Sequence, residues 1–138
     1  MLQIVGSYRQ QQNQNEAGGI LLGRMWPDKI VVEQVSVPGL GDRSGRHFFE
    51  RDSKRAQKAI DEAWEKSGGE VRYLGEWHTH PERHPTPSCQ DKKMISGVFH
   101  RSPYRYGPIL LLIVGTATLW LGVQTERRLH SLNLRSTW

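Results

Sequence analysis

The segment that most constrains the fold is residues 75–91, GEWHTHPERHPTPSCQD. His78 and His80 are two positions apart, so on an extended strand both imidazoles leave the same face and converge on one point. Asp91 follows eleven residues after His80, beyond a loop that prolines keep open, and its carboxylate could return to that point. The segment therefore predicts a metal site built from a strand, an open loop and a returning carboxylate.

Two neutral imidazoles and one carboxylate suit a divalent metal of borderline softness, zinc above all. Three protein ligands leave the fourth tetrahedral position for water, which distinguishes a catalytic zinc from a structural one. Simpler interpretations exist, because a single histidine is more often a surface or hydrogen-bonded residue. The sequence SCQD at residues 88–91 also matches a helix capping box. The two interpretations of Asp91 are compatible, since a residue in the first helical turn can both cap and coordinate.

Two motifs resemble those of a known family. The motif HTHP at residues 78–81, followed after six residues by SCQD at 88–91, resembles the core motif of the JAMM (JAB/MPN-plus) metalloproteases. Residues 16–23, EAGGILLG, are similar to the strand of that family whose glutamate is the general base. The segments EAGGILLGR, PGLGDRSGRHFFERD and YLGEWHTHPERHPTPS together resemble the bacterial JAB isopeptidases encoded in anti-phage CBASS operons. The resemblance covers residues 16 to about 115, most of the chain.

The resemblance implies a set of site residues. It implies one zinc ion per chain, held by His78, His80 and Asp91. It also implies Glu16 as the general base, because only the family pattern brings this distant glutamate to the metal water. Ser88 is the candidate oxyanion donor, since its hydroxyl can donate to a developing negative charge; its alternative role is the helix N-cap alone.

The roles of three neighbouring residues stay open. Glu76 lies two residues before His78, on the same face of the strand, and could act as a base or orient the ligands. His84 could form a three-histidine site, but the resembled family uses Asp91 instead. Cys89 would have a somewhat lowered pKa at a helix start, yet an inert thiol is the simpler interpretation.

The resemblance also implies a substrate. It implies cleavage after a glycine-ended tail that lies as an added strand beside the catalytic strands. In the CBASS relatives this tail is the C-terminus of a cGAS-like nucleotidyltransferase, which a ubiquitin-ligase-like partner joins to target proteins. The chain is expected to reverse that ligation. Trp77, Phe48, Phe49 and the loop of residues 39–45 are candidate contacts for the tail.

Two other functions remain open beside this one. The chain could be a JAMM peptidase that trims a ubiquitin-like or sulfur-carrier precursor without any conjugation pathway. It could instead be a nucleic-acid-binding JAB module, which a steeply salt-dependent DNA affinity would favour. A catalytically dead scaffold is the least favoured function, because the chain keeps every metal ligand of the motif.

Length and composition reduce the number of possible folds and functions. A length of 138 residues predicts a single domain, residues 1–138, with residues 1–15 partly flexible. It also excludes barrel amidohydrolases, whose H-x-H motif opens a fold of roughly 250 residues. The net charge of +5 is spread along the chain, which favours an acidic protein partner, or none, over nucleic acid. One cysteine, no signal peptide and no apolar run of membrane-spanning length predict a cytoplasmic protein without membrane association.

Hydrophobic periodicity predicts an α+β (α/β) sandwich, a mixed β-sheet flanked by helices, and the resemblance implies the cytidine-deaminase-like JAMM form of it. A helix over residues 56–64 is expected to start at Asp52 and end at Gly68 and Gly69, and a second helix includes residues 94–99. The fully apolar run of residues 109–114 indicates a buried central strand. Further strands are expected at residues 19–23, 30–37, 47–51, 71–78, 116–124 and 129–134.

Overall fold

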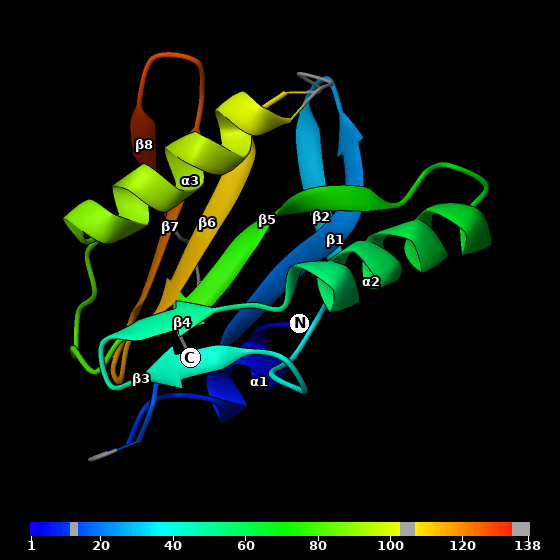
Figure 1. Ribbon diagram of the computed structural model, residues 1–138. Coiled ribbons are helices and arrows are strands. Elements are labelled where there is room, and N and C mark those ends of the chain that lie inside the picture. The colour runs from blue at the N-terminus through cyan, green and yellow to red at the C-terminus, as the bar shows by residue number, and fades with distance from the viewer. Residues whose placement is uncertain (12–13, 103–106, 134–138) are drawn as a thin grey trace.

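The fold is built on a mixed β-sheet. The computed structural model describes residues 1–11, 14–102 and 107–133. The strands of the sheet are β1 (Gly18–Trp26), β2 (Lys29–Val35), β5 (Arg72–Thr79), β6 (Ile109–Val114), β7 (Leu119–Gln124) and β8 (Leu129–Leu132). They lie in the order β2-β1-β5-β6-β7-β8, with β5 and β6 parallel and the other neighbours antiparallel (Figure 1). The expected mixed sheet of an α+β protein is confirmed.

The remaining elements are three helices and a hairpin. The helices are α1 (Leu2–Ser7), α2 (Ser53–Lys66) and α3 (Cys89–Arg101). A separate hairpin consists of β3 (Arg43–Gly45) and β4 (Phe48–Glu50), which pair with each other and not with the main sheet. None of the helices in the described part of the chain combines the length and apolarity needed to cross a bilayer.

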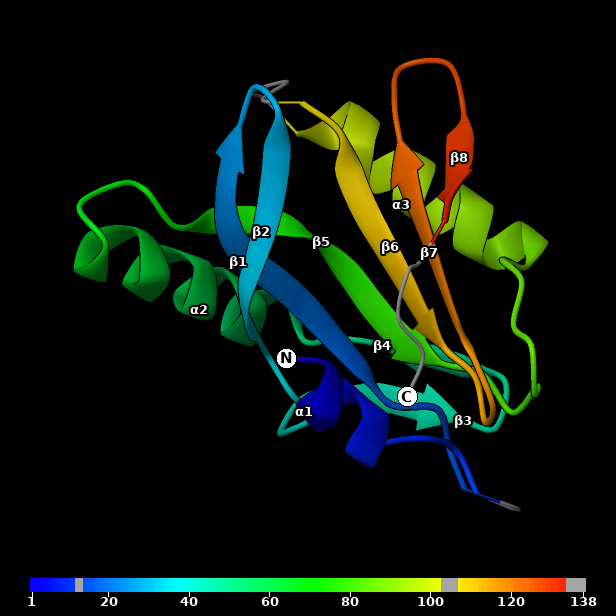
Figure 2. The same cartoon turned by 180° about the vertical axis from the view of Figure 1, so that it is seen from behind.

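The two faces of the sheet are covered differently. α2, α3 and the β3–β4 hairpin lie over one face, and the short α1 lies over the other (Figures 1 and 2). On the α1 face, Val5 packs with Leu74 and Trp77. On the opposite face, one apolar cluster lies under α2 and another lies under α3. Because side chains alternate along β5, Trp77 enters the α1-side core, whereas Glu76 and His78 face the side that carries the hairpin.

The limits of α2 follow from its end residues. Asp52 accepts a hydrogen bond from the backbone N–H of Arg55 at 2.8 Å, which satisfies one of the free donors at the helix start. Gly68 and Gly69 follow the helix with φ of 66° and 87°, a backbone region that favours glycine. The predicted start and end of this helix are confirmed.

Some predicted boundaries differ from the structure. The strand expected from residue 116 begins at Leu119, because the chain turns first, with the N–H of Gly115 bonding to the carbonyl of Thr118 at 2.9 Å. The loop that was expected up to residue 45 already contains β3. Residues 103–106 of the expected loop and residue 134 of the last expected strand lie outside the described residues. Trp77 is a wrong prediction as a tail contact, since it is 1% exposed within the α1-side core.

Candidate metal centre

Three side chains from two elements meet where β5 ends. The Nε2 atoms of His78 and His80 lie 3.2 Å apart, with Oδ1 of Asp91 3.1 Å from that of His78 and Oδ2 3.1 Å from that of His80. Ligands bound at about 2.0–2.1 Å to a tetrahedral zinc lie roughly 3.3 Å from one another, so the two imidazole nitrogens are spaced as two ligands of one ion, with the carboxylate beside both. Within the described residues this is the one group of three side chains that could hold a metal ion.

Local structure aims these three groups at each other. His78 lies within β5, and the N–H of His80 bonds to the carbonyl of Val114 at the end of β6, at 3.0 Å. Asp91 is in the first turn of α3, whose capping box is complete. The Ser88 hydroxyl oxygen accepts from the Asp91 N–H at 3.0 Å, and the Ser88 N–H donates to Oδ2 of Asp91 at 2.8 Å. The helix cap therefore orients the carboxylate toward the histidines.

The charge state of Asp91 suits a ligand. Burial alone would raise the pKa of Asp91, but its hydrogen bonds to His78 and His80 and the N–H of Ser88 hold that pKa below its usual range. Burial likewise opposes protonation of His80, but Asp91 raises the pKa of this imidazole overall. Nδ1 of His80 is buried without a hydrogen-bond partner among the described residues. Oε1 of Glu82 lies 3.3 Å from it, within ion-pair range but outside hydrogen-bond geometry.

Glu16 approaches the metal ligands from the segment just before the neighbouring strand β1. It lies two residues before β1, where its N–H bonds to the carbonyl of Gly45 at 2.8 Å. Its side chain lines a cavity of about 210 Å³ together with His78 and Asp91. Burial raises the pKa of Glu16 to about 7; the charge of His80 opposes this shift, and that of Asp91 adds to it. A carboxyl group that titrates near neutral pH can both accept and release a proton.

The β3–β4 hairpin forms one wall of this cavity. Phe49 lies over Gly18, where a Cβ atom would be 2.6 Å from Cδ1 of the ring, and Gly18 is paired with His78. Glycine at this position therefore lets an aromatic ring lie beside a candidate ligand. The cavity is also lined by His47, Phe48, Glu50, Gln90 and Met94. Of the hairpin residues that line the cavity, the two phenylalanines are the ones predicted as contacts for the tail.

Other predicted residues lie apart from this cluster. Ser88 is next to Asp91 as the N-cap, but it is not among the residues that line the cavity. His84 is exposed, with its Nδ1 3.1 Å from the hydroxyl of Thr118. Cys89 is exposed at the first position of α3. Glu76 is paired with Arg51 and is not among the residues that line the cavity.

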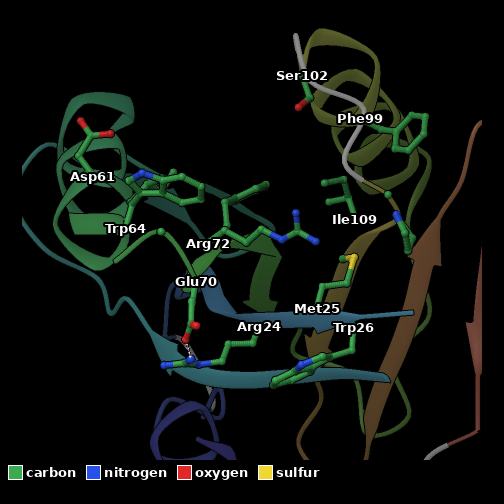
Figure 3. Close-up of a pocket in the computed structure, with 15 residues that line it drawn as sticks. Arg24, Met25, Trp26, Asp61, Trp64, Glu70, Arg72, Phe99, Ser102 and Ile109 are labelled. Atoms are coloured by element: carbon green, nitrogen blue, oxygen red, sulfur yellow. Dashed lines mark hydrogen bonds and ion pairs between the residues drawn. The ribbon is translucent and has the colours of Figure 1, made fainter. Parts of the chain in front are cut away.

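A larger cavity lies at the other end of β5. Its volume is about 800 Å³, and it opens between the C-terminal ends of α2 and α3 and the hairpin of β1 and β2 (Figure 3). The guanidinium of Arg72 points into it, with Trp64 on one side and Met25 on another. It contains none of the predicted site residues.

The chain is similar to known proteins over most of its length. Residues 1–130 match the family described as "Prokaryotic homologs of the JAB domain". A "CD-NTase/cGAS isopeptidase" of Vibrio cholerae is 40% identical over 124 residues, which cover 89% of this chain and 76% of that protein. A protein of the same name from Escherichia coli is 34% identical over 130 residues, 93% of this chain and 80% of that protein.

The fold also matches solved structures. The solution structure of a protein from Desulfitobacterium hafniense superposes with a TM-score of 0.65, covering 95% of this chain and 84% of that one. The two sequences are 24% identical, so this match supports the fold alone. The expected architecture is confirmed.

Proposed function

The chain belongs to the family of prokaryotic homologs of the JAB domain, and on that premise we propose that it is a metal-dependent isopeptidase. Its substrate in this proposal is a CD-NTase, a cGAS-like nucleotidyltransferase, whose C-terminal tail is joined to another protein. The names of the relatives from Vibrio cholerae and Escherichia coli support this choice of substrate. The reaction would act in CBASS anti-phage defence.

The observation that carries the proposal is the convergence of His78, His80 and Asp91 beside Glu16. Two imidazole nitrogens 3.2 Å apart, each 3.1 Å from a carboxylate oxygen, form a ligand set with one open side. These donors fit zinc, and His78, His80 and Asp91 would hold it. When bound, zinc supplies a water with a pKa near 7 and polarises the scissile carbonyl.

The residues around the metal position would carry out proton transfer and stabilise the oxyanion. Glu16 accepts a proton from the attacking water and passes it to the leaving amine as the C–N bond breaks. The oxygen of the water joins the carbonyl carbon, so the products are a carboxylate and an amine. Ser88 would donate a hydrogen bond from its hydroxyl to the carbonyl oxygen, because its oxygen already accepts from the Asp91 N–H and its own O–H is available.

The shape of the cavity supports an extended tail with a small last residue. Phe48 and Phe49 form part of its wall, so a bulky side chain next to the scissile bond would meet these rings. The β3–β4 hairpin pairs only with itself among the described strands, so an extended peptide can add to it as a further strand. A glycine-ended tail satisfies both conditions.

The test is a gel assay on two substrates that carry the same CD-NTase tail. In one the tail is linked to a lysine side chain of a target protein, and in the other it is followed directly by a reporter protein. The zinc-loaded chain should cleave the lysine-linked conjugate, while Glu16→Ala should keep its zinc and lose cleavage by roughly 10²–10⁴-fold. Cleavage of the linear fusion alone would favour precursor trimming instead. A zinc-loaded wild type that cleaves neither substrate would overturn the proposal.

The conjugating partner stays a prediction from the resemblance. A ubiquitin-ligase-like enzyme would have to make the conjugate that this chain opens. Co-expression of such an enzyme with its CD-NTase should yield conjugates that disappear when the active chain is added. Conjugates that persist with active chain present would contradict the pairing.

A further inference from the structure

A buried acid on the metal-bearing strand has a complete set of partners. Glu76 lies on the same face of β5 as His78 and is 6% exposed. Nε of Arg51 donates to its two carboxylate oxygens at 2.9 and 3.0 Å, and Nη2 lies 2.8 Å from Oε1. The hydroxyl of Tyr73 donates to Oε1 at 2.7 Å. This two-pronged, charge-assisted pairing is among the strongest that a carboxylate can form.

Arg51 ties two separate parts of the molecule together. It follows β4 immediately and precedes Asp52, the N-cap of α2. The hairpin shares no strand ladder with the main sheet, so the bond from Arg51 to Glu76 connects the base of the hairpin to β5. The turn of the hairpin is held separately, by hydrogen bonds to the carbonyls of Gly45 and Arg46.

The position of the hairpin decides the shape of the cavity. Phe48 and Phe49 are on β4, which ends one residue before Arg51, and both line the cavity beside His78. A shift at the base of β4 would therefore move both aromatic rings relative to His78. The ion pair acts on the wall of the cavity and not on the ligands, since no hydrogen bond or ion pair described here joins Glu76 to either histidine.

We propose that Glu76 is a positioning residue: through Arg51 it holds the β3–β4 hairpin at the height above the cavity that the substrate tail requires. The inference rests on the proposed function for its consequence in catalysis, and on the ion pair alone for its consequence in structure. It differs from a role in orienting the metal ligands, which would make metal binding depend on Glu76.

The kinetic test uses Glu76→Gln, which keeps the shape of the side chain but replaces one acceptor oxygen by an N–H group that faces the guanidinium. The zinc-loaded variant should show KM raised about tenfold for the lysine-linked conjugate of the CD-NTase tail, with kcat changed less than about threefold. Arg51→Lys should also raise KM more than it changes kcat, but by a smaller factor. Lysine keeps the positive charge but lacks the planar guanidinium that can bond both carboxylate oxygens. The double variant should be no worse than Glu76→Gln, since both changes remove one interaction.

The matched control is Glu33→Gln, the same chemical change in a more exposed pair with Arg24. It should leave both KM and kcat within about twofold of wild type, as expected for a surface ion pair. Zinc content per chain should be unchanged in all these variants.

A structural readout separates this inference from the proposed function. Amide hydrogen exchange of residues 43–50 should be faster in Glu76→Gln and Arg51→Lys than in wild type or Glu33→Gln, while exchange in β6 stays the same. Unchanged exchange in the hairpin would overturn the inference whatever the activity. So would loss of zinc in Glu76→Gln, or a decrease confined to kcat. If the wild type cleaves nothing, the proposed function fails and hydrogen exchange still decides whether the tether exists.

Discussion

The two ends of β5 differ in a way that shows how a site is located. At the Arg72 end lies a cavity of about 800 Å³, bordered by Trp64, which is 52% exposed. At the Thr79 end lies a cavity of only about 210 Å³, which Glu16 lines together with His78 and Asp91, two of the three convergent ligand groups. The smaller cavity is the candidate site, because convergent donors and not volume give a cavity its chemistry.

The acidic residues at the two ends of β5 also have different kinds of ion-pair partner. At the Arg72 end, Glu70 and Glu33 both pair with Arg24, a cation that does not lose its proton. At the Thr79 end, Asp91 pairs with two imidazoles, which become neutral donors when they release their protons. The first arrangement is a surface ion pair, whereas the second can exchange its protons for a metal.

The largest effect is expected from Asp91→Asn, which removes the charge at the Thr79 end and preserves the size of the cap. Zinc affinity and cleavage should both fall by roughly 100-fold or more, since an amide is a weak ligand. The control is Glu70→Gln at the Arg72 end, which should change cleavage less than about twofold. Metal titration and the gel assay measure the two effects, and similar losses in both variants would break the distinction between the ends.

A smaller effect is expected from Gly18→Ala beside His78. The new Cβ would lie 2.6 Å from Cδ1 of Phe49 and 2.6 Å from the backbone oxygen of Trp77, so both the hairpin and the pairing of β1 with β5 must shift. KM should rise by about tenfold, as for other displacements of a positioned wall. Gly97→Ala in α3 is the control, because its Cβ meets only the flexible end of Arg101 and alanine favours a helix by about 1 kcal/mol. Equal KM values in both variants would contradict a role for the hairpin wall.

Trp64→Ala tests whether the large cavity contributes to cleavage. The side chain is half-exposed, so its loss should lower the free energy of unfolding by about 1 kcal/mol or less and change kcat/KM less than about twofold. Thermal unfolding and the gel assay measure these quantities. A loss of cleavage with intact folding would mean that the Arg72 end takes part in the reaction.

The smallest expected effect is on the pH dependence of stability, through Asp42, whose carboxylate is paired with Arg55. Burial would raise the pKa of Asp42, but hydrogen bonds from the N–H groups of Asp52 and Gly39 and from Arg55 lower it overall. A lowered pKa in the folded state stabilises the protein above the ordinary aspartate pKa of about 3.9, and this stability is lost as the pH falls below it. Asp42→Asn should therefore flatten the loss of thermal stability between neutral and acidic pH. An unchanged slope would contradict this account.

Much of the fold follows from local sequence. The apolar run of residues 109–114 is β6, and Asp52 begins α2 as expected, because strand burial and helix capping depend on neighbouring residues. The meeting of His78, His80 and Asp91 follows from strand alternation and the capping box, although their roles in metal binding stay predictions. The same alternation should have placed Trp77 in the opposite core.

The rest depends on contacts between distant residues. The position of the hairpin over the cavity rests on Phe49 lying over Gly18 and on Arg51 reaching Glu76 across 25 residues. No local pattern predicts such a pair, because an arginine near an acid is common in any sequence. The approach of Glu16 to His78 was predicted from the family resemblance alone, for the same reason.

The proposed zinc site is tested most directly by the zinc content of purified wild type, His78→Ala and Glu16→Ala, measured by elemental analysis after removal of loosely bound metal. The account predicts about one zinc per chain in wild type and in Glu16→Ala, and close to none in His78→Ala. A full zinc in His78→Ala, or none in wild type supplied with zinc, would contradict it.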